Sequence, residues 1–279
     1  RAVFLGNSIT DGGRYHSFIW LYYMTRFPNM PIRVFNGGIG GDTAYDMNKR
    51  LDGDIFSKNP TVLMVTFGMN DSGYYEYNGD NAKEFGEQKY QESIKNFQQM
   101  EKRFKELPHT RIVMTGTSPY DETAQIKDNT VFKKKNETIK RIIEYQRESA
   151  ARNGWEFTDW NAPMVAINQE LQQKDPSFTL CGNDRIHPDN DGHMVMAYLF
   201  LKAQGLAGKL VADIRIDGAG KKVTRSDNCR VSDLSVSSDN LTFTYEAKSL
   251  PYPIDTSYYD NEKHTQADAL SVIPFMDEM

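Results

Sequence analysis

The segment AVFLGNSITDGG at residues 2–13 joins an apolar run to a serine and a turn rich in glycine. The apolar residues 2–6 predict a buried strand, and the polar and glycine residues after them predict a turn. In parallel α/β sheets, ligands bind beyond the carboxyl ends of the strands. Ser8 is therefore expected at a ligand-binding edge of a sheet, unless it only caps the next helix.

Four further segments share the apolar, β-rich composition of residues 2–6, and longer segments with helical periodicity lie between them. The run at 61–68 is almost continuously apolar, as in a strand that is covered on both faces. This alternation predicts an α/β fold: a three-layer α/β/α sandwich with a mostly parallel central sheet over residues 1–206. We predict strands at 2–6, 32–38, 61–68, 111–117 and 156–160, and helices at 17–27, 83–107, 136–154 and 192–205.

The pattern changes beyond this first unit. Apolar and polar residues alternate with a period of two in KLVADIRID, CRVSDLSVSS and LTFTYEA, which is typical of strands with one exposed face. The residues SSDN at 237–240 predict a turn between the last two strands. We therefore predict a second unit at 207–279, a small β-rich appendage packed on or beside the core. Within it, the proline-rich residues 249–255 predict an extended segment.

The chain has 279 residues, a net charge of −5, 39% hydrophobic and 25% charged residues. This composition suits a globular core, and the negative balance predicts no affinity for nucleic acid or anionic membranes. No apolar run reaches the roughly 18–20 residues of a membrane helix. Cys181 and Cys229 lack the spacing of a metal site and can either pair or stay free. Both chain ends lie in apolar segments, so we expect a longer natural chain, in which a signal sequence can precede residue 1.

Three other clusters of small and polar residues lie where predicted strands end or where the last helix begins: NGGIGGDT (36–43), FGMND (67–71) and NDRIHPDNDGH (183–193). Asn70 offers two N–H donors, and Asp184 and His187 are three residues apart, so they can face the same way. Taken singly, each cluster is also explained as an ordinary turn. The glycines do not complete a dinucleotide-binding fingerprint, because Thr43 stands at the third glycine position. We expect the neighbouring carboxylates to be helix caps: Asp42, Asp71, Asp189 and Asp191.

The clusters are much more specific together than apart. GNSITDGG, GGIGGDT, GMND and DRIHPD resemble the four sequence blocks of the SGNH hydrolases, also called GDSL-like esterases and lipases. All four occur in the family's order and span residues 4–188. One departure is Asn7, where the family usually has aspartate, at a position that is not catalytic. The resemblance implies the flavodoxin-like SGNH fold. It implies little about the C-terminal unit, which lies outside the shared core.

The resemblance also implies the roles of the site residues. Ser8 would be the nucleophile, His187 its general base, and Asp184 the group that orients the imidazole. The oxyanion hole would consist of the backbone N–H groups of Ser8 and Gly41 and the side-chain amide of Asn70. The α/β-hydrolase alternative fits less well, because its nucleophile elbow is G-x-S-x-G after a central strand, whereas this chain has GNSIT, with Thr10 at the second glycine position, after the first strand.

The implied activity is ester hydrolysis. Similarity to secreted bacterial members favours small acyl groups, mainly acetyl, on carbohydrates. A lysophospholipase or thioesterase is the alternative, and a glycan-binding protein with a vestigial hydrolase core is an alternative of another class. Tyr74, Tyr75 and Tyr77 follow the asparagine block and would either stack on sugar rings or pack the loop.

The expected partner is therefore a small-molecule or glycan ester. No cofactor or metal is implied, since acyl transfer by such a triad needs none and no cluster of residues has ligand spacing. The similarity to secreted members implies a periplasmic or extracellular location. The sequence leaves the oligomeric state open.

Overall fold

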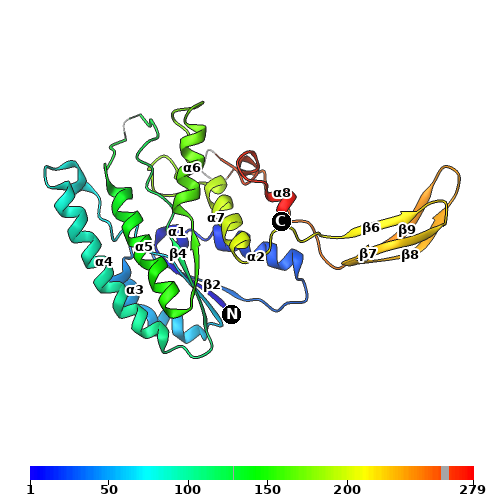
Figure 1. Cartoon of the computed structure of the whole chain (residues 1–279), viewed down its shortest axis with the longest axis horizontal. Helices are drawn as coiled ribbons and strands as arrows, with labels where there is room; N and C mark the ends of the chain where they lie inside the picture. Colours follow the sequence, from blue (N-terminus) through cyan, green and yellow to red (C-terminus); the bar gives the residue numbers. More distant parts are fainter. Residues whose placement is uncertain (128, 259–263) are drawn as a thin grey trace.

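The central sheet carries the site and lies between two helical layers (Figure 1). The computed structural model describes residues 1–127, 129–258 and 264–279. All five strands of the sheet are parallel, in the order β2-β1-β3-β4-β5, which confirms the predicted α/β fold. The strands are β1 (Ala2–Gly6), β2 (Val34–Gly38), β3 (Val62–Val65), β4 (Arg111–Gly116) and β5 (Glu156–Asp159).

Alternation of side chains along each strand builds one hydrophobic core on each face of the sheet. Phe4 and Met64 belong to the first core, whereas Val3, Leu5 and Val65 belong to the second. Figure 1 shows the corresponding helices on opposite sides of the strands. The first layer contains α2 (Tyr15–Arg26), α6 (Asn161–Leu171) and α7 (Asn190–Ala203), and the second contains α3 (Ala44–Arg50), α4 (Ala82–Lys105) and α5 (Lys135–Asn153).

The four predicted helices correspond to α2, α4, α5 and α7, with each end within two residues. The helices α3 and α6 and the single turn α1 (Ser8–Asp11) were not predicted. Two of them are too short for a periodic pattern, since periodicity needs a window of about 11 residues or more. In α6 the start is set by Asp159, whose carboxylate accepts the backbone N–H of Asn161 at 2.9 Å. The remaining helical segments are η1 (Leu51–Ile55), η2 (Phe56–Lys58), η3 (Tyr75–Asn78), η4 (Ala267–Ser271) and α8 (Phe275–Glu278).

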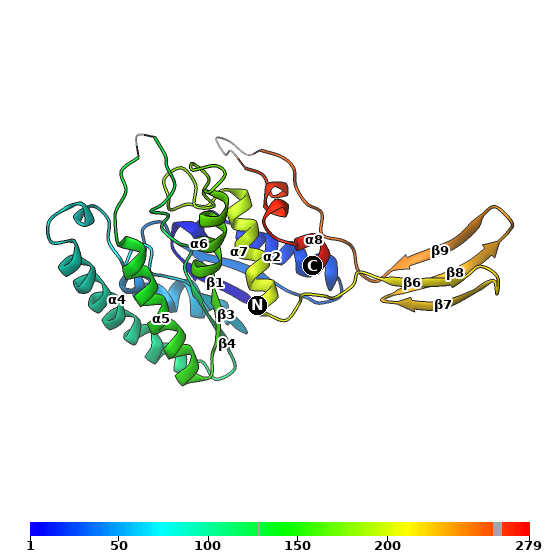
Figure 2. The same cartoon turned by 45° about the horizontal axis from the view of Figure 1, so that its top comes forward.

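The predicted unit at 207–279 divides into two parts. Its first part is a pair of antiparallel hairpins that project away from the core (Figures 1 and 2). Its second part, described at residues 249–258 and 264–279, returns to the core, and Tyr252, Phe275 and Met279 are buried against the first layer. The hairpins are β6 (Asp213–Asp217) with β7 (Lys222–Asp227), and β8 (Cys229–Val236) with β9 (Leu241–Ala247).

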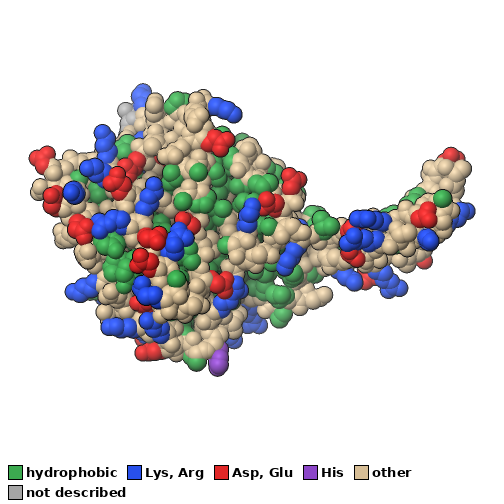
Figure 3. All heavy atoms as spheres, viewed as in Figure 1, with side chains coloured by type: hydrophobic (Ala, Val, Ile, Leu, Met, Phe, Trp, Pro, Cys, Tyr) green, Lys and Arg blue, Asp and Glu red, His purple; other side chains and the backbone are tan. Residues whose placement is uncertain are grey.

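Other sequence expectations concern the cysteines, the surface and metals. Cys181 and Cys229 are both buried and unpaired, which settles the open alternative in favour of free thiols. In the face shown in Figure 3, basic and acidic side chains are intermixed rather than separated into patches of one sign.

Over the described ranges, no helix has the length and apolar character needed to cross a membrane. Within those same ranges, no three histidine, cysteine or carboxylate side chains gather in a way that could hold a metal ion.

Candidate active site

Ser8 is the first residue of α1, directly beyond the carboxyl end of β1. The helix cap is not Ser8 but Asn7, whose Oδ1 accepts the backbone N–H of Ile9 at 3.1 Å. The Ser8 hydroxyl is therefore available for another partner, and its Oγ lies 2.7 Å from Nε2 of His187. Gly38 at the end of β2 makes this arrangement possible, since a Cβ there would come within 2.2 Å of the backbone nitrogen of Asp11.

His187 and Asp184 reach the serine from a tight turn before α7. His187 Nδ1 lies 2.6 Å from Asp184 Oδ2, so a continuous chain of hydrogen bonds runs from Ser8 to the carboxylate. The turn requires Gly182, which has a φ of +69° and where a Cβ would meet the carbonyl oxygen of His187 at 2.1 Å. The side chains of His187 and Asp184 are 47% and 51% exposed, so the site is open.

The electrostatics of Asp184 favour its charged form. Burial raises the pKa of this carboxyl, but hydrogen bonds from the His187 ring and from the backbone N–H groups of His187 and Ile186 outweigh it. The pKa of Asp184 consequently lies below its ordinary value. A carboxylate that stays ionised can hold the proton of Nδ1 and stabilise an imidazolium.

The other predicted site residues approach the same edge from the loops after β2 and β3. Gly41 has a φ of +83°, a conformation that glycine adopts without strain. Asn70 Nδ2 donates to the carbonyl oxygen of Asp42 at 2.9 Å, which ties the two loops together. Among the described residues, the backbone N–H groups of Ser8 and Gly41 have no acceptor within the protein. These donors are thus free to bind an oxygen atom of a ligand.

One of the expected helix caps has another role. Asp42 accepts a hydrogen bond from Nε of Arg50 at 2.6 Å, and Arg50 also donates to the carbonyl oxygens of Gly6 and Gly37. Burial raises the pKa of Asp42, against the opposing effect of Arg50. This arginine therefore joins the ends of β1 and β2 to the glycine-rich loop, a role that its place in the sequence did not indicate.

Asp71 is buried and does cap a helix, but not the one that follows it. Its Oδ1 accepts the backbone N–H of Ala44 in α3 at 2.9 Å and the hydroxyl of Ser93 at 3.1 Å. Its Oδ2 accepts the backbone N–H of Gly68 at 3.0 Å. One carboxylate thus holds the loop of the site asparagine against two helices.

Arg185 lies between the two triad residues of the turn and was not assigned a role from the sequence. Its side chain is 1% exposed, and Nη1 donates to the carbonyl oxygens of Asp121 and Ala124 at 3.1 and 2.7 Å. It also has a positive φ of 70°. The turn that carries His187 is thereby anchored to the loop after β4.

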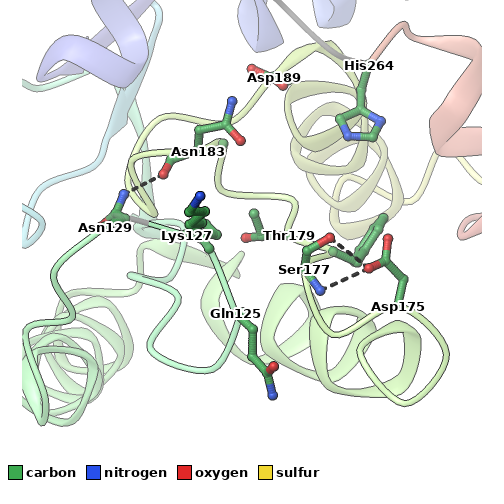
Figure 4. A pocket seen from close by; sticks show the side chains of 12 residues that line it. Gln125, Lys127, Asn129, Asp175, Ser177, Thr179, Asn183, Asp189 and His264 are labelled. Carbon is green, nitrogen blue, oxygen red and sulfur yellow. Dashed lines mark hydrogen bonds between the residues drawn. The ribbon is translucent and has the colours of Figure 1, made fainter.

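A pocket of about 720 Å³ lies beside the triad (Figure 4). It adjoins the turn through Gly182 and Asn183, but Ser8 and His187 do not line it. The close-up shows amide, hydroxyl and carboxylate side chains around it, and Ser177 donates to the carboxylate of Asp175. The other lining residues are Gln125, Ile126, Lys127, Asn129, Phe178, Thr179, Asp189 and His264.

The chain is similar to known proteins in both sequence and structure. The chain is 82% identical to BT4096, a gut microbial diltiazem-metabolizing enzyme, whose solved structure matches 100% of this chain with a TM-score of 0.97. This chain spans 63% of the length of that protein. It is also 24% identical, over 221 residues, to an acetylxylan esterase of Geobacillus stearothermophilus, with 74% of this chain and 94% of the esterase covered.

The solved structures include a catalytic mutant of that esterase, Axe2, in which a serine is replaced by alanine. It has a TM-score of 0.57 and 22% identity, and the match covers 73% of this chain and 93% of the esterase. This likeness supports the fold. The GDSL-like Lipase/Acylhydrolase family itself matches residues 4–195, which include all four sequence blocks. The chain therefore belongs to the GDSL-like lipase/acylhydrolase family of hydrolases, the SGNH hydrolases.

Proposed function

We propose that this chain is a serine esterase that removes acetyl and other small acyl groups from alcohol oxygens. The observation that carries the proposal is the chain of hydrogen bonds from Ser8 Oγ through the His187 ring to Asp184. It lies at the strand ends where α/β proteins bind ligands. Free backbone donors and the Asn70 amide occupy the same edge.

In the proposed reaction, Ser8 Oγ attacks the carbonyl carbon of the ester while its proton passes to Nε2 of His187. The negative charge on the carbonyl oxygen is stabilised by the N–H groups of Ser8 and Gly41 and by the amide of Asn70. His187 then returns the proton to the alcohol oxygen as the C–O bond breaks. Water then attacks the acyl carbon while His187 takes its proton, and His187 returns that proton to Ser8 Oγ as the bond between the acyl carbon and Oγ breaks and the acid leaves.

The relatives support acetyl esters as the substrate class. The similar proteins are described as a diltiazem-metabolizing enzyme and an acetylxylan esterase. Diltiazem and acetylxylan both carry acetyl esters. The open site agrees with this proposal, because His187 and Asp184 are about half exposed. A site this open has room for a bulky alcohol, but it would bury little of a long acyl chain. We therefore favour small acyl groups over lipid or thioester substrates, and carbohydrates or drug-like alcohols as carriers.

The experiment is a comparison of p-nitrophenyl acetate, butyrate and dodecanoate, followed by acetate release from diltiazem and acetylated xylo-oligosaccharides. We expect kcat/KM to fall with chain length and acetate to be released from at least one acetylated compound. A preference for dodecanoate would contradict the proposal and favour a lipid substrate. Release from the oligosaccharides alone would sharpen the substrate to carbohydrate.

Labelling with a fluorophosphonate probe tests the nucleophile separately. The wild type and the matched variant Ser57→Ala, at an exposed serine, should be labelled, and Ser8→Ala should not. If the folded wild type took up no probe and hydrolysed no ester, the glycan-binding alternative would replace the esterase.

A further inference from the structure

The orientation of the Asn70 side chain is set by two hydrogen bonds. Nδ2 donates one hydrogen to the Asp42 carbonyl oxygen at 2.9 Å, and Oδ1 accepts the hydroxyl of Tyr74 at 2.5 Å. An amide group is planar, so these two bonds also fix the direction of the second hydrogen on Nδ2. That hydrogen is the one available for an oxyanion.

Tyr74 is held as a neutral hydroxyl donor. Burial raises the pKa of its phenol, and the nearby charge of Asp184 raises it further. Its ring lies edge-on to Phe132, with centroids 5.9 Å apart. The hydroxyl therefore donates to Asn70 from a ring that cannot move freely.

Lys135 contacts the Tyr74 ring and the loop that carries Asn70. Its side chain is 0% exposed, and Nζ lies 3.8 Å from the centroid of the Tyr74 ring, as in a cation–π contact. Nζ donates to the carbonyl oxygens of Met69 and Gly73 and to the hydroxyl of Ser72, each at 2.6 Å. The three acceptors come from both sides of the site asparagine in the sequence.

A buried ammonium is costly, so its retention needs a reason. Burial lowers the pKa of Lys135 to about 7, although the charges of Asp71 and Glu122 oppose this shift. Three acceptors match the three hydrogens of an ammonium group. The proposed reaction has no step that uses this lysine, whereas its three hydrogen-bond acceptors all belong to the loop of the oxyanion donor.

We propose that Lys135 and Tyr74 are positioning residues for the oxyanion hole. Lys135 fixes the loop at 69–73 and the ring of Tyr74, and the hydroxyl of Tyr74 fixes the amide of Asn70. This inference rests on the proposed esterase function. It assigns to Tyr74 a role in orienting the catalytic amide, in place of the sugar stacking or simple loop packing considered from the sequence.

The first test is Tyr74→Phe, which removes only the hydroxyl, with Tyr75→Phe as the matched control. Tyr75 is 79% exposed and also lies edge-on to Phe132. With p-nitrophenyl acetate, we expect kcat to fall about tenfold in Tyr74→Phe, as for the loss of one hydrogen bond, with KM within about twofold. Tyr75→Phe should keep both constants. An unchanged kcat in Tyr74→Phe would overturn the inference.

A double-mutant cycle tests whether the effect passes through the amide. Asn70→Ala alone should lower kcat about 10²–10³-fold, as for the loss of one oxyanion donor. In that background, Tyr74→Phe should lower kcat no further than about twofold. A full tenfold loss in both backgrounds would show that Tyr74 acts elsewhere and would contradict the proposal.

Lys135→Met, with the exposed Lys140→Met in the same helix as control, tests the lysine. Among correctly folded molecules, counted by active-site titration, we expect kcat to fall about 10–100-fold with little change in KM. A lysine that only stabilised the fold would lower the number of active molecules and leave kcat per site unchanged. Should Lys135→Met not fold, the cycle with Tyr74→Phe still decides the proposal.

The failure of this inference is distinguishable from failure of the esterase proposal. If Ser8→Ala retained hydrolysis of p-nitrophenyl acetate, the proposed serine esterase mechanism with Ser8 as nucleophile would be wrong. If Ser8→Ala lost hydrolysis but Tyr74→Phe retained the full kcat, only the positioning role would be overturned.

Discussion

The loop at residues 68–73 and the hairpin of β8 and β9 are both short segments outside the central sheet, but they are held in opposite ways. The loop is bonded to other elements by Lys135 of α5 and by its own buried Asp71, which accepts hydrogen bonds from Ala44 of α3 and Ser93 of α4. The hairpin is held mainly by its own ladder, from Cys229 paired with Ala247 to Val236 paired with Leu241. Every residue of β9 is exposed.

The two segments therefore differ in how firmly the rest of the molecule holds them. Two-stranded ribbons are only marginally stable alone, and Leu241, Phe243 and Tyr245 remain 44%, 38% and 43% exposed. Catalytic geometry, by contrast, needs side chains fixed by packing and by further hydrogen bonds. We therefore expect changes at the strand ends to alter catalysis, and changes in the hairpins to alter it little.

The largest expected effect is that of Ser8→Ala. Loss of a triad nucleophile leaves only the oxyanion hole and binding, so kcat for p-nitrophenyl acetate should fall about 10⁴-fold or more. The thermal midpoint should stay within about 2 °C, because a half-buried hydroxyl contributes little to stability. The exposed Ser57→Ala is the control. A smaller loss, below about tenfold, would remove Ser8 from the reaction.

A pair of phenylalanines compares the two parts of the C-terminal unit. Phe275 is 1% exposed and belongs to the first core, whereas Phe243 in β9 is 38% exposed. Phe275→Ala should lower the free energy of unfolding by about 3–5 kcal/mol, and Phe243→Ala by less than about 1 kcal/mol. Urea titration measures both. Equal costs would show that the hairpin is as tightly packed as the returning segment.

Two buried histidines near the active edge predict acid sensitivity of the fold. Burial lowers the pKa of His16 and of His193, so both stay neutral in the native state. Below about pH 6.5 the unfolded chain takes up protons that the native chain does not, and stability falls with pH. We expect the two histidines to lower the free energy of unfolding by about 1–3 kcal/mol between pH 7.5 and 5.5, against Asp191, whose pKa is raised by burial to about 7, so that it takes up a proton in this range only in the native state. His193→Gln should flatten this dependence in urea titrations, and the exposed His109→Gln should not.

The smallest effect is expected from removing the hairpins. Asn228 Nδ2 donates to the carbonyl oxygen of Val211 and to the hydroxyl of Ser249, so the two ends of the hairpin segment lie close together. Replacing residues 212–248 with a short Gly-Ser linker should keep kcat within about twofold on p-nitrophenyl acetate. A loss of tenfold or more in kcat would mean that the hairpins, like the loop at 68–73, support the site.

Much of the fold was predictable from local pattern. The five strands of the sheet and the four long helices follow from apolar periodicity, because burial on one or both faces imposes that period. The clusters around Ser8, Asn70 and His187 were recognisable as well. Parallel strands bring their carboxyl ends to one edge, so polar clusters at several strand ends predict a shared site.

Other features depend on contacts between distant segments, which no local pattern encodes. Nothing in the residues around Lys135 indicates that its amino group would bind the loop of Asn70. The same is true of Arg50 and Arg185, which bind backbone carbonyl groups of β2 and of the loop after β4. Carbonyl groups are present at every residue, so a sequence does not show which of them a buried cation will meet.

By itself, the sequence determined the α/β class and the order of strands and helices along the chain, and it indicated the residues expected to carry the chemistry. Only the tertiary structure decided the orientation of those residues, the free state of Cys181 and Cys229, and the division of the C-terminal unit. The physical reason is that periodicity records whether a residue is buried. Which partner it meets there depends on how the layers and loops pack around it.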